Sequence, residues 1–122
     1  MAKVLLIEDE YAMRQMYATM LRTDGHEVLE AEQGMDGYSQ AINNKPDLVF
    51  LDFRLPDTNG LAILKMLTEN KDFNSPVVIL TNYAGDVDVD AIKAAGATAI
   101  LLKYEVTPSM LVEKAREFLG KK

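Results

Sequence analysis

The segment Asp47–Pro56 constrains the fold of this chain more than any other part of the sequence. Its four consecutive apolar residues, Leu48 to Leu51, run directly into one acid, Asp52. A continuous apolar run of this length is typical of a strand buried on both faces, as in a parallel sheet. Pro56 then supplies turn chemistry. Asp52 is therefore predicted at the carboxyl end of a buried strand, which is the edge where ligands bind in open α/β sheets.

Apolar segments alternate with helical patterns along the chain. The strands are predicted over residues 4–7, 26–31, 48–51, 77–80 and 99–102. The helices are predicted over residues 13–21, 34–43, 61–68, 86–95 and 108–119. Gly25 and Gly96 suit the position just after a helix end. This alternation predicts an α/β protein with a doubly wound, parallel five-stranded sheet covered by helices on both faces.

The composition limits what the protein binds. The 122 residues suit one domain, predicted over residues 1–122. The absence of cysteine excludes disulfides and thiolate chemistry. The net charge of −6 argues against direct binding to nucleic acid and fits a cation site or a basic partner. The first apolar run, Val4–Ile7, is too short for a signal peptide or a membrane span, so no membrane insertion is expected.

Polar residues follow four of the predicted strands. Glu8 and Asp9 follow the first, Asp52 the third, Thr81 the fourth and Lys103 the fifth. If the strand order is two-one-three-four-five, these residues converge on one edge of the sheet. A pair of like charges about 4 Å apart costs about 4 kcal/mol at an effective dielectric constant of about 20, so the three carboxylates require a cation. Oxygen ligands without a histidine–cysteine set favour Mg²⁺ over zinc.

This set of side chains suits the transfer of phosphate onto a carboxylate. Asp52 would be the nucleophile. Mg²⁺ and the Lys103 ammonium would neutralise the charge on the transferred phosphoryl group. The Thr81 hydroxyl would donate a hydrogen bond to a phosphoryl oxygen. Each residue alone fits a strand-end cap or a surface charge, but their joint placement favours a site.

In order and spacing, these residues resemble the receiver domain of two-component response regulators. The resemblance rests on Glu8–Asp9, Asp52 within Leu-Asp-Phe-Arg-Leu-Pro, Thr81 after Val-Val-Ile-Leu, Gly96–Ala97, and Lys103. It covers essentially the whole chain and implies a flavodoxin-like (βα)5 fold with strand order 2-1-3-4-5. It also implies a cytoplasmic protein that receives a phosphoryl group on Asp52 from a histidine kinase or a histidine phosphotransfer protein.

The resemblance further assigns roles around the metal and the output surface. Asp9 and Asp52 would contact Mg²⁺ together with the backbone carbonyl of Arg54, and Glu8 would act largely through water. Phosphorylation would draw Thr81 inward and alter the face made by the fourth helix, the fifth strand and the fifth helix, where a downstream protein would bind. Such a module is not an enzyme for other substrates, since it would catalyse only its own phosphorylation and dephosphorylation.

Three positions depart from the family pattern. Ile100 stands where an aromatic residue usually follows the movement of the threonine. Asn82 replaces a small residue, so its amide would either bond the phosphoryl group or narrow the entrance. Tyr104 stands where the family has proline after a cis bond. Because a cis bond before a non-proline residue costs about 3–4 kcal/mol, a trans Lys103–Tyr104 bond and a reshaped loop are predicted.

Arg54 and Tyr83 flank the same entrance as Asn82. We hypothesise that these bulky side chains shield the acyl phosphate from water, against the alternative of tolerated variation at a solvent-exposed edge. Two other patterns are interpreted as structural. The acid-rich segment 86–90 lacks the glycine and glutamate of a calcium loop, and it is expected to stabilise a helix N-terminus. A helical stripe is interpreted as core filling: Met13, Met16, Tyr17, Met20 and Leu21.

Two other functions compete with phosphorylation-controlled signalling. One is a phosphatase of the haloacid-dehalogenase type, which also uses an aspartyl nucleophile at a strand end. That class needs a second aspartate two residues later, where this chain has Arg54. The other is a receiver-like binding module that acts without phosphorylation. Ile100, Asn82 and Tyr104 favour it, whereas the intact acids and Lys103 argue against it.

Overall fold

The computed structural model describes residues 2–82, 85 and 88–120 of the chain. Strands and helices alternate along the described residues. In chain order they are β1 (Lys3–Ile7), α1 (Tyr11–Thr23), β2 (Glu27–Ala31), α2 (Gly34–Asn44), β3 (Leu48–Asp52), α3 (Gly60–Glu69), β4 (Val77–Thr81), α4 (Val89–Ala94), β5 (Ala99–Leu102), η2 (Lys103–Glu105) and α5 (Pro108–Gly120). None of the described helices is long and apolar enough to cross a membrane.

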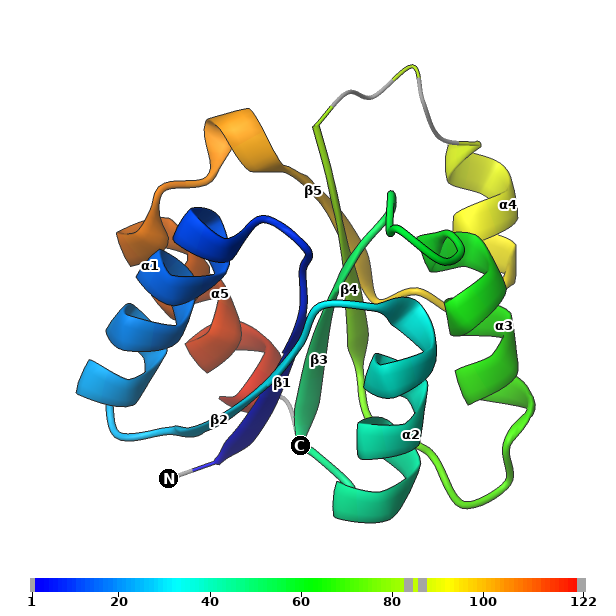
Figure 1. Cartoon of the computed structure of the whole chain (residues 1–122), viewed down its shortest axis with the longest axis horizontal. Coiled ribbons are helices and arrows are strands. Elements are labelled where there is room, and N and C mark those ends of the chain that lie inside the picture. The colour runs from blue at the N-terminus through cyan, green and yellow to red at the C-terminus, as the bar shows by residue number, and fades with distance from the viewer. Residues whose placement is uncertain (1, 83–84, 86–87, 121–122) are drawn as a thin grey trace.

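The five strands form one parallel sheet in the order β2-β1-β3-β4-β5. Helices α1 and α5 lie together on one face of the sheet, and α2, α3 and α4 lie on the other face (Figure 1). This arrangement confirms the predicted doubly wound α/β fold and the strand order 2-1-3-4-5. Because every strand runs in the same direction, the carboxyl ends of β1, β3, β4 and β5 meet at one edge.

The sheet divides the core into two apolar layers. Along β1, Val4 and Leu6 pack into the layer under α1 and α5, whereas Leu5 and Ile7 pack into the layer under α2 and α3. All four side chains are buried. A strand covered on both faces has no solvent-facing position, which is why its sequence is an unbroken apolar run rather than an alternating one.

The main differences from the sequence prediction concern α4 and the turn η2. Helix α4 was predicted over residues 86–95 and is described over Val89–Ala94. Asp88 is its N-cap, since the Asp88 carboxylate accepts a hydrogen bond from the Ala91 amide at 3.0 Å. Residues 86 and 87 of the acid-rich segment lie outside the described residues. The 3-10 turn η2 was not predicted, although a reshaped loop after the fifth strand was. At the helix ends, Gly25 and Gly96 have φ of +94° and +106°, as predicted.

The helical stripe of α1 is only partly a core stripe. Tyr17 and Leu21 are buried, and Met13 and Met20 pack against the same layer. The interpretation of Met16 as core filling was wrong, since this residue is 51% exposed. Residues of α5 complete the apolar layer under α1, and Met16 lies outside that layer.

Gly37 on α2 allows this helix to lie close to β1. A Cβ atom at residue 37 would lie 2.6 Å from Cγ1 of Ile7, which is buried and has no room to move away. Overpacking of this kind costs about 1–3 kcal/mol, more than the gain of up to about 1 kcal/mol that alanine brings to a helix. Gly37→Ala is therefore expected to lower the free energy of unfolding by about 1–2 kcal/mol in urea denaturation.

The matched control is Gly120→Ala on α5, where the added Cβ atom would meet nothing within 4 Å. This variant should be as stable as the wild type or slightly more stable. Equal stability of the Gly37 and Gly120 variants would contradict the close approach of α2 and β1.

Candidate functional site

The carboxyl edge of the sheet gathers the acids, the hydroxyl and the lysine that the sequence placed at strand ends. Glu8 follows β1, Asp52 ends β3, Thr81 ends β4, and Lys103 follows β5. All four are at least 96% buried, which is unusual for charged side chains, whereas Asp9 is exposed. Buried ionisable groups need partners, so the contacts among them define the site.

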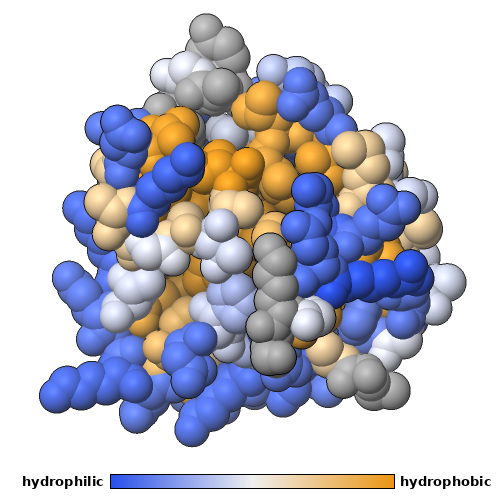
Figure 2. Space-filling view, turned by 180° about the vertical axis from the view of Figure 1, so that it is seen from behind, coloured by the Kyte–Doolittle hydropathy of each residue, from blue (hydrophilic) through white to orange (hydrophobic). Residues whose placement is uncertain are grey.

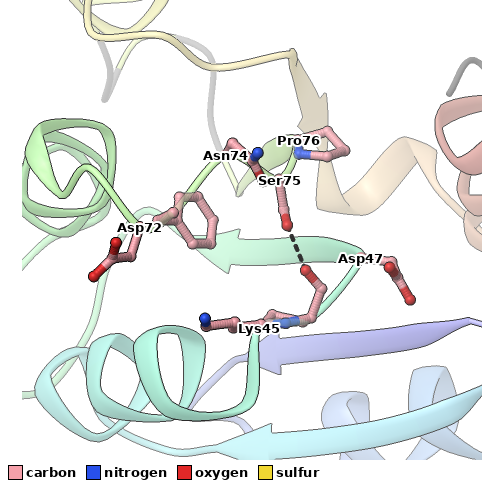
Figure 3. A pocket seen from close by; sticks show the side chains of 8 residues that line it. Lys45, Asp47, Asp72, Asn74, Ser75 and Pro76 are labelled. Atoms are coloured by element: carbon pink, nitrogen blue, oxygen red, sulfur yellow. Dashed lines mark hydrogen bonds between the residues drawn. The ribbon is translucent and has the colours of Figure 1, made fainter.

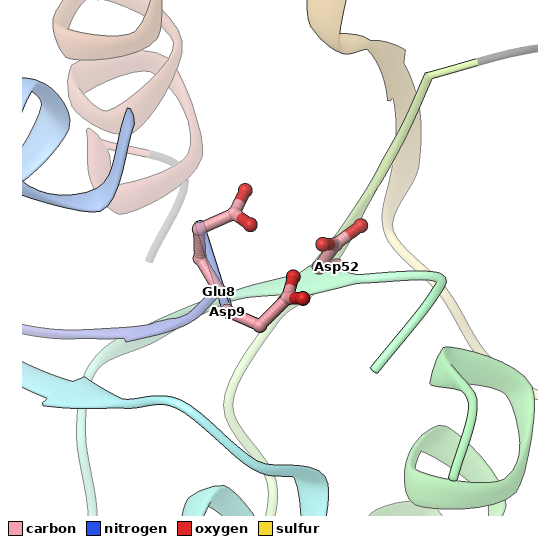
Figure 4. Close-up of side chains that lie close together, drawn as sticks. All are labelled: Glu8, Asp9 and Asp52. Atoms are coloured by element: carbon pink, nitrogen blue, oxygen red, sulfur yellow. The ribbon is translucent and has the colours of Figure 1, made fainter. Parts of the chain in front are cut away.

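Three carboxylates form the centre of the site. Glu8, Asp9 and Asp52 each offer one oxygen atom, and these atoms lie within 4.8 Å of one another. Figure 4 shows the Glu8, Asp9 and Asp52 carboxylates gathered at the ends of β1 and β3. Mutual repulsion at this range disfavours three negative charges unless cations are present.

Lys103 is the cation that balances part of this charge. Its Nζ atom lies 2.5 Å from Glu8 Oε1, 3.1 Å from Asp52 Oδ2 and 3.4 Å from Glu10 Oε1. Burial alone would lower the pKa of Lys103, but the hydrogen bonds and charges of Glu8 and Asp52 outweigh burial and raise its pKa. The lysine is therefore held in its charged form.

The environment of Asp52 disfavours its charged form, in contrast to that of Lys103. Burial raises the pKa of its carboxyl group, the negative charge of Glu8 raises it further, and Lys103 offsets only part of the increase, so that the pKa stands at about 7. Near neutral pH and without metal, the protonated and the charged form of Asp52 are thus both populated. An additional cation would favour the carboxylate, which is the nucleophilic form.

The loop after β3 is built to hold Asp52. The Phe53 amide continues the ladder to Leu80 O at 2.8 Å, and the Gly60 amide returns to Phe53 O at 2.6 Å. A Cβ atom at residue 60 would lie 2.9 Å from Phe53 Cα and 3.0 Å from Asp52 O, so only glycine fits. The Arg54 amide donates to Asp52 Oδ1 at 3.4 Å, while the Arg54 side chain is exposed.

Asp57 anchors this loop to α2. Its carboxylate accepts hydrogen bonds from the Gly34 amide at 2.8 Å and the Met35 amide at 3.0 Å, and so caps α2 from a distant part of the chain. The Met35 and Gly34 hydrogen bonds lower the pKa of Asp57. Sequence reasoning assigned Asp57 only to a turn cluster, since nothing local signals a cap for a helix that begins 23 residues earlier.

The remaining predicted residues lie around the rim. Asn82 is exposed next to Thr81, and Ile100 is half-buried on β5, paired with Ile79 of β4. Tyr104 is 69% exposed on η2. The Lys103–Tyr104 bond is trans, as predicted, and the described residues contain no cis peptide bond. Tyr83 lies outside the described residues.

Two hollows elsewhere help to delimit the site. One, of about 400 Å³, lies at the opposite edge of the sheet, where the Ser75 hydroxyl donates to Pro46 O beside the start of β3 (Figure 3). Its lining includes none of the predicted site residues. The other, of about 460 Å³, is an open groove that runs from Thr81 along β5, past Ile100 to Val89 of α4. The lining of the second hollow includes the site residue Thr81.

Two residues close to the acids were missed in the sequence. Glu10 contacts Lys103, and its amide donates to Glu8 Oε2 at 3.0 Å. Arg14 is 5% exposed and donates to the backbone carbonyl of Glu8 at 2.8 Å. Arg14 lies three residues before Tyr17 and seven before Leu21, both buried, and this helical spacing is the one sequence signal that Arg14 shares the inward face of α1.

The donor set fits a divalent cation of the magnesium type. Carboxylate oxygens are the ligands that Mg²⁺ prefers, and the three acids outnumber the one buried lysine. Glu8 already binds Lys103 through one oxygen and the Glu10 amide through the other. Asp52 likewise contacts Lys103 and the Arg54 amide, so Asp9 is the acid of the three whose carboxylate is least engaged by other described residues.

Comparison with known proteins identifies the family. The response regulator receiver domain model matches residues 4–116. Protein PilH of Pseudomonas aeruginosa is 35% identical over 104 residues, which cover 84% of this chain and 86% of PilH. The fold is similar to a CheY-like receiver domain from Methanospirillum hungatei, with a TM-score of 0.90, 27% identity, and coverage of 98% of this chain and 94% of that one. It is also similar to chemotaxis protein CheY4 of Vibrio cholerae, with a TM-score of 0.88 and 28% identity. The match covers 97% of this chain and 98% of CheY4. The chain belongs to the response regulator receiver domain family.

Proposed function

We propose that this receiver domain is a phosphoacceptor that takes a phosphoryl group onto Asp52 from a phosphohistidine of a histidine kinase or a histidine phosphotransfer protein. The observation that carries the proposal is the contact set of Asp52: a buried carboxylate at a strand end, 3.1 Å from the Lys103 ammonium and clustered with Glu8 and Asp9. As a cytoplasmic signalling module, it would catalyse only its own phosphorylation and dephosphorylation, without contacting nucleic acid or membrane.

In the proposed reaction, an Asp52 oxygen forms a bond to phosphorus while the phosphorus–nitrogen bond of the phosphohistidine breaks. The electron pair of that bond stays with the imidazole, which takes up a proton. Asp9, Asp52 and the Arg54 carbonyl would hold Mg²⁺, with Glu8 acting through water, and the metal would supply positive charge to the phosphoryl oxygens. Lys103, whose Nζ atom lies 3.1 Å from Asp52 Oδ2, would supply a second positive charge.

The proposed effect of phosphorylation on a downstream protein depends on the position of Thr81. Its hydroxyl would donate a hydrogen bond to a phosphoryl oxygen on Asp52, and Thr81 also lines the groove beside β5. Every residue of β5 is half-buried, and Val89 on α4 is 39% exposed. Figure 2 shows hydrophobic side chains gathered on this side of the molecule. These features support the α4–β5–α5 face as the surface that a downstream protein would bind, and a shift of Thr81 would change its shape.

A phosphodonor assay tests the proposal. The protein is incubated with Mg²⁺ and a small-molecule phosphodonor, and mass spectrometry follows the covalent phosphoryl group, which is expected on Asp52 only and only with Mg²⁺. Beryllofluoride should shift the amide resonances from Thr81 to Lys103. A protein that binds partners but never takes up phosphate would be a binding module, and rapid hydrolysis of many phosphate esters would indicate a phosphatase.

We also propose that side chains at the entrance to the site slow hydrolysis of the acyl phosphate. The Arg54 side chain is exposed immediately beyond Asp52, and we expect it, with Asn82 and Tyr83, to restrict the approach of water to the acyl phosphate. Arg54→Ala is expected to speed dephosphorylation about three- to tenfold, corresponding to about 1 kcal/mol of barrier. Loss of the phosphoryl group is followed after removal of the donor. The control is Lys71→Ala, an exposed cation beyond α3, and equal lifetimes in both variants would refute shielding.

A further inference from the structure

Arg14 is the only buried basic residue of the described chain besides Lys103, and it lies beside the acidic site rather than in it. Its guanidinium makes three polar contacts: Nη1 donates to Glu8 O at 2.8 Å, Nε to Glu30 Oε1 at 2.9 Å, and Nη2 to Glu32 Oε1 at 3.2 Å. The Tyr11 ring lies 5.6 Å from its Cζ atom. One side chain of α1 thus joins the end of β1 to the end of β2 and the loop beyond it.

The contact with Glu8 O matters because of the peptide to which that oxygen belongs. The carbonyl is part of the planar unit that links Glu8 to Asp9, so fixing its oxygen also fixes the amide and the Cα atom of Asp9. The Asp9 side chain makes no hydrogen bond or ion pair with any described residue. Its direction therefore depends on the backbone, and Arg14 is the side chain that holds that backbone.

Glu8 is held at each of its polar groups. Its amide donates to Ala31 O at 3.0 Å, Oε2 accepts from the Glu10 amide at 3.0 Å, and Oε1 lies 2.5 Å from Lys103 Nζ. Arg14 provides the fourth contact, on the carbonyl. Without that contact, Glu8 would still be held by its amide and its carboxylate, but the carbonyl of the Glu8–Asp9 peptide would lose its side-chain partner.

We infer that Arg14 is a positioning residue of the acidic site, which orients the Glu8–Asp9 peptide so that the three carboxylates converge before any cation binds. This inference rests on the proposed function, because the convergence serves Mg²⁺ binding. A group that orients a metal ligand without touching the metal typically changes the affinity by about 10- to 100-fold when it is removed. Arginine suits the role because its planar fork reaches three acceptors at once, whereas lysine supplies a single point of charge.

The test compares Arg14→Gln and Arg14→Lys with Arg22→Gln. Arg22 is a matched control, since it binds the other oxygen of Glu30 at 3.0 Å but makes no contact with Glu8. Calorimetric titration with Mg²⁺ should show affinity about tenfold weaker for Arg14→Gln. Arg14→Lys should lie between this variant and the wild type, and Arg22→Gln should bind like the wild type.

A second readout needs no metal and separates positioning from general stability. Hydrogen exchange of the Glu10 amide, which donates to Glu8 Oε2, should become faster in the Arg14 variants, while the Gly60 amide on the other side of the site should change only with global stability. Arg14→Lys keeps the test informative if Arg14→Gln does not fold.

The outcomes distinguish the two proposals. Wild-type protein that binds no Mg²⁺ would overturn the proposed function, and the exchange of the Glu10 amide would still test Arg14. Wild-type protein that binds Mg²⁺ while both Arg14 variants bind it equally well would overturn the role of Arg14. Uniform acceleration of exchange across the core would do the same, because it would indicate a purely structural residue.

Discussion

Replacing Asp52 with asparagine is expected to abolish phosphoryl uptake and, at the same time, to stabilise the metal-free protein at neutral and alkaline pH. Uptake is lost because the amide is not a nucleophile for phosphorus. Stability is gained because burial and the charge of Glu8 raise the pKa of Asp52 to about 7, so the carboxylate is less favourable in the folded than in the unfolded chain. The neutral amide removes that penalty.

The pH window follows from the direction of this shift. A carboxyl group whose pKa is raised on folding binds more protons in the folded state, so the wild type should lose stability as the pH rises from about 4 to about 7. The full difference from the ordinary value of 3.8 would correspond to about 4 kcal/mol, which is an upper bound. Urea denaturation between pH 4 and pH 8 with a chelator should show this loss in the wild type and not in Asp52→Asn.

Asp57→Asn is the matched control with the opposite sign. The pKa of Asp57 is lowered by its hydrogen bonds to Met35 and Gly34, so this carboxylate stabilises the fold above its unfolded pKa and ceases to do so as the pH falls. The control variant should therefore be less stable than the wild type at pH 7. An Asp52→Asn protein that is less stable than the wild type at pH 8 would contradict the repulsion described for the site.

Lys103→Met is expected to have the second large effect, on both stability and reactivity. The Nζ atom contacts Glu8, Glu10 and Asp52, and the side chain is 1% exposed. Removing one partner of a buried ion pair costs about 3–5 kcal/mol, because the other charge is left buried and unpaired. We expect a loss of about 3 kcal/mol in metal-free protein, since protonation of an acid relieves part of the repulsion. Phosphoryl uptake should slow about 100-fold with the loss of one stabilising charge.

Mg²⁺ should restore much of the lost stability, because it binds the folded state and neutralises the same carboxylates. At about 100 times its dissociation constant, a ligand adds about 2.7 kcal/mol to the stability of the fold. Uptake should stay slow, since the metal does not replace the lysine beside the phosphoryl group. Lys114→Met removes an exposed cation that lies 3.6 Å from Glu117 and should change stability by less than about 0.5 kcal/mol. Identical stabilities of the two variants without metal would refute the ion-pair description.

The strands and the polar residues at their ends could be predicted because both depend on local signals, whereas the strand order 2-1-3-4-5 was implied by the resemblance to receiver domains. The apolar run before Asp52 and the similar runs before Glu8 and Thr81 indicated doubly covered strands, and parallel strands place their ends at one edge. Lys103 was predicted at the same edge because it directly follows the apolar run of the fifth strand. The trans bond before Tyr104 followed from the energy of a non-proline cis bond, and the structure confirms it.

The features that sequence reasoning missed depend on contacts between distant parts of the chain. Asp57 caps a helix that precedes it by 23 residues, and no pattern in a short window reveals such a pair. The burial of Arg14 depends on three acceptors: one just after β1, one in β2 and one in the loop after β2. Met16 fits the helical period but lies outside the layer that α5 completes. Each is decided by tertiary packing, which overrides a local pattern.

The origin of the site in four separate strands has a consequence for how the sequence can vary. Each of β1, β3, β4 and β5 delivers its polar residue from the last position of the strand or just beyond it. Inserting or deleting one residue in any of these strands would turn its apolar side chains to the opposite face and move its polar residue away from the other three. The site is therefore sensitive to strand length as much as to residue identity, so gaps between relatives should fall in the loops and spare these strands.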